Sequence, residues 1–146
     1  MKIFEKSLKE YIWPIKWYLI ASIIIVVFQY EGMLAYIGYN EILARITQWL
    51  WELFVALAVF TLMWKHNFNL KQIFFAGILF SITIHGLKAF VFRVFFFPYS
   101  PESWPWLHIY KFLYGSAIVM AVTLATGIVT YYYKKLKKSL LIKINY

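Results

Sequence analysis

The sequence predicts an all-α membrane protein, in which four transmembrane helices form an up-down-up-down bundle with both termini in the cytoplasm. The composition is the first reason, because 63% of the 146 residues are hydrophobic and only 14% are charged, against about 25% charged in soluble domains. The second reason is that four apolar stretches have about the length a helix needs to cross a bilayer. The third is that eleven of the fifteen basic residues flank these stretches on one side and three on the other, which places the richer side in the cytoplasm.

The first fourteen residues predict an amphipathic helix that lies in the plane of the membrane. Phe4 and Leu8 would share an apolar face, and Lys6 and Lys9 a charged one, as in interfacial helices. Pro14 would then turn the chain into the bilayer. A solvated helical lead-in is the alternative interpretation.

The remaining residues complete a single integral membrane domain that covers residues 1–146. The predicted transmembrane helices are about 15–37, 42–64, 72–97 and 106–133. A basic cytoplasmic tail, 134–146, follows the last helix, and its lysines would attract anionic lipid. The tryptophans agree with this arrangement, because Trp13, Trp17 and Trp64 would lie at the inner interface and Trp49, Trp51, Trp104 and Trp106 at the outer one.

Ionisable side chains inside the predicted helices are the first candidates for a site. Placing such a group in the membrane costs free energy, so it normally faces protein or water. The intramembrane cluster consists of Glu31, Glu52, His85 and Lys88, and its outer rim of Arg45, Arg93 and Lys111. We expect Glu52 and Lys88 to pair, since they lie at similar depth. The cluster would join two helices, form a water-accessible cavity for a proton, an ion or a small anion, or contact a partner subunit.

Small residues predict where helices pack closely. Gly77 and Ser81 share a stripe with His85 and Lys88 on the third helix. On the fourth helix the small residues Ala117, Ala121 and Ala125 recur every four positions, a pattern that lets helix backbones approach. The alanine stripe would pack inside the bundle or against another subunit or a second copy.

Several function classes are excluded by the residue types. The chain has no cysteine and no aspartate, which removes thiolate metal sites and thiol or aspartate catalysis. His66, His85 and His108 lie at three different depths, so we expect no haem, no metal and no other cofactor. We identify no catalytic residues, and we expect no nucleic-acid partner because the basic residues flank the helices instead of forming a folded basic face.

One pattern resembles the phosphate-starvation-inducible E family of small four-helix membrane proteins. It comprises WELFVALAVF in the second helix, KHNFNLK in the link, SITIHGLK in the third helix and LYGSAIV in the last. The resemblance covers about 42–133 and implies that Glu52, His66, Lys71 and Lys88 are the matching positions, with Lys88 where that family would have an arginine. Because that family has no settled biochemical activity, the resemblance implies architecture and no particular chemistry.

These observations predict a small, non-enzymatic, multi-pass protein of the inner or plasma membrane. Its most direct role would be that of an accessory subunit of a larger respiratory or transport complex, with the lipid bilayer and other membrane subunits, or itself as a homo-oligomer, as partners. The alternative is a small oligomeric transporter or channel that uses a site formed by Glu52, His85 and Lys88.

Overall fold

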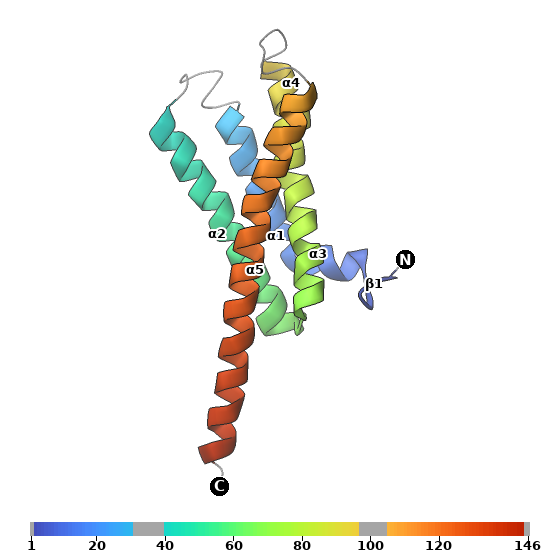
Figure 1. Ribbon diagram of the computed structural model, residues 1–146, viewed down its shortest axis with the longest axis vertical. Coiled ribbons are helices and arrows are strands. Elements are labelled where there is room, and N and C mark those ends of the chain that lie inside the picture. Colours follow the sequence, from blue (N-terminus) through green and yellow to red (C-terminus); the bar gives the residue numbers. More distant parts are fainter. Residues whose placement is uncertain (1, 31–39, 97–104, 145–146) are drawn as a thin grey trace.

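Four long helices dominate the computed structural model, which describes residues 2–30, 40–96 and 105–144 (Figure 1). Helix α1 is Leu8–Val27, α2 is Glu41–His66 and α5 is Pro105–Ile144. The third long helix starts as α3 (Leu70–Ser81), continues as the π-helix η2 (Ile82–Phe92) and ends as α4 (Arg93–Phe96). Within the described residues, four stretches are long and apolar enough to cross a membrane: Leu8–Tyr30, Glu41–His66, Leu70–Phe95 and Pro105–Leu140. The predicted four apolar helices are therefore confirmed, and they indicate a membrane protein.

One hydrophobic core holds the long helices together. Helix α5 packs against α3 and α2, and α1 packs against α2. Each long helix contributes side chains with 0–1% exposure, among them Ile15, Trp51, Phe80 and Val119. Large apolar side chains also cover the outside of the bundle, as a surface that faces lipid requires.

The connection between α2 and α3 is short because both helix ends are capped. Asn67 ends α2 in the left-handed conformation, with φ 53°, which asparagine tolerates better than most residues. The Asn69 side chain accepts a hydrogen bond from the Gln72 backbone N–H at 3.0 Å, and Gln72 returns the bond to form a capping box. The Lys134 Nζ donates to the Met63 carbonyl at 2.9 Å, which satisfies a terminal carbonyl of α2.

The amphipathic helix predicted for residues 1–14 is wrong over its first half. Strands β1 (Lys2–Ile3) and β2 (Lys6–Ser7) form an antiparallel hairpin instead. Helix α1 begins at Leu8 because Ser7 and Glu10 form a capping box, in which the Ser7 backbone N–H donates to the Glu10 carboxylate at 2.7 Å. The helix therefore begins only after the hairpin, at Leu8.

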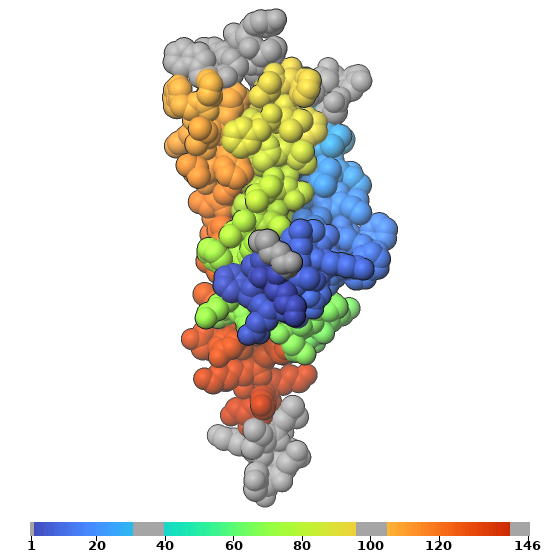
Figure 2. Space-filling model, turned by 90° about the vertical axis from the view of Figure 1, so that its right-hand side faces the viewer, coloured from blue at the N-terminus to red at the C-terminus, as the bar shows by residue number. Residues whose placement is uncertain are grey.

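Contacts with the bundle hold this hairpin in place. The Tyr11 hydroxyl donates to the Ile3 carbonyl at 2.9 Å, and the Gln72 Nε2 donates to the Phe4 carbonyl at 2.9 Å. Figure 2 shows the N-terminal segment on the outside of the bundle, beside α3. The first turns of α1 run across the bundle and the rest runs along it (Figure 1), and Pro14 inside the helix explains the change of direction because it removes one backbone hydrogen bond.

Helix α5 differs from its prediction in length and in the face that it buries. It continues through the predicted tail to Ile144 and extends beyond the other helices (Figure 1). Ala117, Ala121 and Ala125 are exposed, so they do not form the contact inside the bundle that was one of their two interpretations. The buried face lies two residues away along the helix and consists of Gly115, Val119, Thr123 and Gly127. Of the two stripes of small residues on α5, the one that contains the two glycines is buried and the alanine stripe is exposed.

Candidate functional site

The candidate site lies where the third long helix changes from α to π geometry. In a π-helix the backbone bond joins residue i to residue i+5, as the bond from the Arg93 N–H to the Lys88 carbonyl does. This geometry is uncommon and occurs frequently at functional sites. The π segment carries both His85 and Lys88, so it sets the direction of the two ionisable side chains of this helix.

His85 and Lys88 line one cavity of about 290 Å³ between α2, η2 and α5. Helix α2 contributes Gln48 and Trp51, and η2 also contributes Ala89. The other lining residues are Tyr30, Arg93, Lys111, Tyr114, Gly115 and Ile118. The cavity is therefore built by residues from all four long helices.

Positive charge dominates the lining of this cavity. Lys88, Arg93 and Lys111 all belong to it, and no carboxylate does among the residues that the structure describes. Charges interact more strongly where protein and lipid exclude water, because the effective dielectric constant falls. The lining is therefore basic, although the Glu52 carboxylate of α2 lies close enough to act electrostatically on Lys88.

A buried N–H and a buried imidazole nitrogen in the cavity wall have no hydrogen-bond partner among the described residues. The Trp51 side chain is 1% exposed and that of His85 is 8% exposed. The Trp51 Nε1 and the His85 Nε2 make no hydrogen bond with any described residue. A buried polar group without a partner costs about 1–3 kcal/mol, so a ligand or a water molecule that bonds these atoms would relieve that cost.

The indole of Trp51 organises the charged and aromatic side chains around it. The Lys88 Nζ lies 5.4 Å from the centroid of the Trp51 ring, within the range of a cation–π interaction. The His85 ring meets the same indole edge-on, with centroids 5.2 Å apart and planes at 86°. On its other side the His85 ring lies so close to Gly115 that a Cβ there would come within 2.5 Å of the His85 Cγ. Only glycine leaves room for this ring.

Glu52 and Lys88 do not form the predicted salt bridge, although Glu52 lies near enough to Lys88 to act on it electrostatically. Among the described residues the one salt bridge joins Arg45 to Glu41 on the surface of α2. Glu52 instead accepts a hydrogen bond from the Gln48 Nε2 at 2.9 Å. Neighbouring residues of an α-helix point roughly 100° apart, and it is Trp51, not Glu52, that α2 turns toward the third helix.

The other predicted site residues have different locations. Arg93 and Lys111, from the predicted rim, line the cavity, whereas Arg45 does not. Gly77 and Ser81 are buried below the cavity, and a Cβ at Gly77 would meet the Met120 Sδ of α5 at 2.7 Å. Glu31 lies outside the described residues.

Sequence analysis missed two residues that shape the cavity. Trp51 was expected at the outer membrane interface with the other tryptophans, but it is buried in the core. Gly115 was not among the predicted site residues. The spacing could have indicated the burial of Trp51, because residues four apart share one face of a helix and Val55 of α2 is buried as well.

No protein-family model matches this chain, and comparisons with curated proteins and with solved structures likewise find no match. The resemblance to the phosphate-starvation-inducible E family therefore stays a prediction. Among the described residues, no group of three or more His, Cys, Asp or Glu side chains is arranged to hold a metal ion. The cavity is thus the feature from which a function can be argued.

Proposed function

We propose that this chain is a non-enzymatic protein of the cell membrane that binds a small anion in the cavity beside Lys88, as a small transporter or channel for anions. In this proposal the bundle is up-down-up-down with both termini cytoplasmic, because basic residues are concentrated at one set of helix ends. The cavity then opens toward the outer half of the membrane, and anions enter it from outside.

The observation that carries the proposal is that Lys88 and the Trp51 Nε1, which makes no hydrogen bond with a described residue, line one cavity whose wall also includes Arg93 and Lys111. Lys88 would be the principal counter-charge because it lies five residues deeper than Arg93 on the third helix, and because Lys111 on α5 is exposed. The Trp51 N–H would supply a neutral donor with no competing protein acceptor among the described residues. A volume of about 290 Å³ lies at the small end of ligand sites, which favours an ion of a few atoms, such as chloride, phosphate, sulfate or a short carboxylate.

The test is anion flux and binding in proteoliposomes that contain the purified chain. Lys88→Gln should reduce anion affinity about 10- to 100-fold, since a hydrogen bond from a charged donor contributes about 1.5–3 kcal/mol. Trp51→Phe, which keeps the ring and removes the N–H, should reduce it less. Lys135→Gln removes the same charge from the exposed tail and should leave affinity unchanged. Equal effects of the Lys88 and Lys135 variants, or potassium flux equal to anion flux, would contradict the proposal.

A second candidate function is that of an accessory subunit in a larger membrane complex. It is favoured by the exposed stripe Ala117, Ala121 and Ala125 on α5, because exposed small residues at four-residue spacing suit close packing of another helix. Extraction from native membranes in a mild detergent should then give a particle heavier than one chain, with other proteins in fixed stoichiometry.

Bulky substitutions distinguish a contact through this stripe from general disturbance. Ala121→Trp should release the partner, whereas Ile24→Trp on α1, which is 61% exposed, should not. A particle that contains only this chain would exclude the accessory-subunit role and leave the anion proposal to the flux assay.

A further inference from the structure

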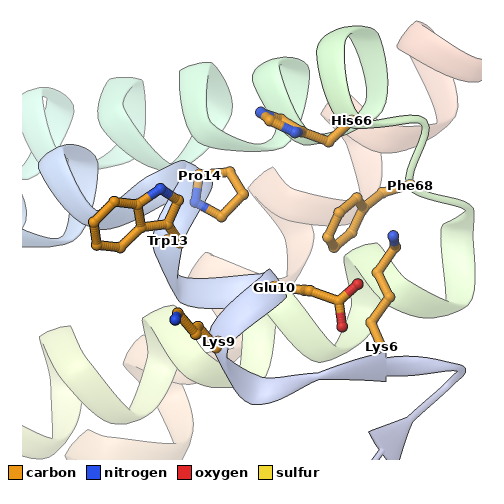
Figure 3. A pocket seen from close by; sticks show the side chains of 7 residues that line it. All are labelled: Lys6, Lys9, Glu10, Trp13, Pro14, His66 and Phe68. Atoms are coloured by element: carbon orange, nitrogen blue, oxygen red, sulfur yellow. The ribbon is translucent and has the colours of Figure 1, made fainter.

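A second cavity lies at the opposite end of the bundle from the anion site, where the N-terminal segment meets the end of α2. Its volume is about 480 Å³. Lys6, Lys9, Trp13, His66 and Phe68 contribute to its walls, together with Glu10 and Pro14 (Figure 3). None of these residues takes part in the anion site described above.

The cationic groups of this cavity are held on ordered backbone. Lys6 belongs to β2, and its Nζ lies 4.6 Å from the centroid of the Phe68 ring. Phe68 is 5% exposed and packs edge-on against the buried Tyr11. Lys9 lies in the first turn of α1, where the helix dipole also favours negative charge. The contact with Phe68 therefore holds the Lys6 side chain in place, whereas the Lys9 side chain is exposed.

The single carboxylate of the lining is already engaged. The Glu10 carboxylate accepts hydrogen bonds from both the backbone N–H and the hydroxyl of Ser7, each at 2.7 Å. The two lysines thus leave an excess of positive charge, with the His66 imidazole as a further hydrogen-bonding group on the α2 side (Figure 3). A phosphate group matches this combination of charge and donors.

An apolar stripe leads away from the cavity along α1. Trp13, Trp17, Ile20 and Ile24 are spaced by four, three and four residues, so they share one face of the helix. Their side chains are 64%, 69%, 43% and 61% exposed. The Lys16 Nζ lies over the two indoles of this stripe, 3.7 Å from the Trp13 ring centroid and 5.2 Å from that of Trp17. A polar cavity that continues into an exposed apolar stripe has the shape of a lipid: a headgroup and an acyl chain.

We propose that this cavity binds the headgroup of one anionic phospholipid, with Lys6 on one side of the headgroup, Lys9 on the other and His66 on the α2 side (Figure 3), and one acyl chain along the Trp13–Ile24 face of α1. The bound lipid would attach the N-terminal hairpin to the membrane at the end of the bundle where α2 ends. This site does not depend on the proposed anion binding near Lys88.

The experiment is native mass spectrometry of the full chain, delipidated in detergent and titrated with phosphatidylglycerol. The pocket variant Lys6→Gln/Lys9→Gln is compared with the tail variant Lys135→Gln/Lys138→Gln, which loses the same two charges. The pocket variant should lose about thirtyfold in affinity because it removes two charged donors from the headgroup, and the tail variant less than about twofold because Lys135 and Lys138 are exposed and line no part of the cavity. Equal losses would overturn the proposal, because they would mean general attraction to a basic surface.

Three further arms separate lipid binding from misfolding and from other ligands. Lys6→Arg/Lys9→Arg should retain phosphatidylglycerol binding if charge at the pocket is what matters, and loss of binding in this folded variant would overturn the proposal. Phosphatidylethanolamine should bind at least about tenfold more weakly than phosphatidylglycerol, and equal binding would refute an anionic headgroup. Inorganic phosphate should not displace the bound lipid, and displacement by phosphate at equal concentration would show a soluble ligand instead.

Discussion

The contact between Gly115 and His85 makes a sharp prediction about stability. A Cβ at position 115 would overlap the imidazole ring, whose Cγ would lie 2.5 Å away and whose Nδ1 and Cε1 nearer still. The ring cannot swing aside freely, because it is buried and packs edge-on against Trp51. Gly115→Ala therefore forces η2 and α5 apart or moves the ring, and overpacking of this kind costs about 1–3 kcal/mol.

Gly86 supplies a matched control. It lies in the same region of the third helix, and a Cβ there would meet nothing nearer than the Ile82 Cγ2 at 3.9 Å. Replacing glycine by alanine inside a helix gains about 1 kcal/mol from propensity at either position. The difference between Gly115→Ala and Gly86→Ala thus isolates the clash and should equal about 1–3 kcal/mol.

The other helical glycines extend the comparison into a series. A Cβ at Gly77 would meet the Met120 Sδ at 2.7 Å, the end of a flexible side chain, and one at Gly127 would meet the Ile73 Cγ2 at 3.2 Å. Methionine adapts to small changes in volume, whereas Thr123, whose Cγ2 would lie 3.0 Å from the Cβ at Gly77, and Ile73 are β-branched and adapt less. The cost of alanine should therefore fall between those for Gly115 and Gly86 at both positions.

Unfolding in detergent, followed by far-UV circular dichroism, measures these differences. The variant His85→Ala removes the ring, so Gly115→Ala added to it should cost little, and the double-mutant cycle should show a coupling of about 1–3 kcal/mol. The reasoning would be refuted if Gly115→Ala were as stable as Gly86→Ala and the cycle showed no coupling.

Three further predictions concern other contacts. Lys134→Met should lower the free energy of unfolding by about 1–2 kcal/mol, because it removes two hydrogen bonds at the end of α2. Lys135→Met, the control, should have little effect in the same detergent unfolding assay. The pair Tyr18→Phe and Thr61→Val should show a coupling of about 0.6 kcal/mol in a double-mutant cycle, since the two hydroxyls lie 3.1 Å apart between α1 and α2; additive effects would contradict the bond. Glu5→Gly should stabilise the hairpin by about 1 kcal/mol because φ is 74° at this position, which slower amide exchange of the hairpin would reveal.

The sequence was sufficient for the parts of the fold that depend on solvent preference. Four long apolar stretches were predicted and four were found, because a chain segment that must satisfy its backbone without water forms a helix wherever its side chains tolerate lipid. The bounds of α2, predicted as 42–64 and found as Glu41–His66, were close because Asn40 and Asn67 mark its ends locally.

The tertiary structure decided which faces meet, and this changed the candidate site. Gly115 on α5 accepts the ring of His85, Trp51 takes the place beside Lys88 that Glu52 was expected to hold, and the alanine stripe of α5 faces outward. For His85 and Lys88, sequence periodicity was misleading because it assumed α-helical spacing through Ile82–Phe92, where the backbone is a π-helix. In an apolar chain nearly every face can be buried at similar cost, so the choice falls to the shapes of the side chains once the helices are in contact.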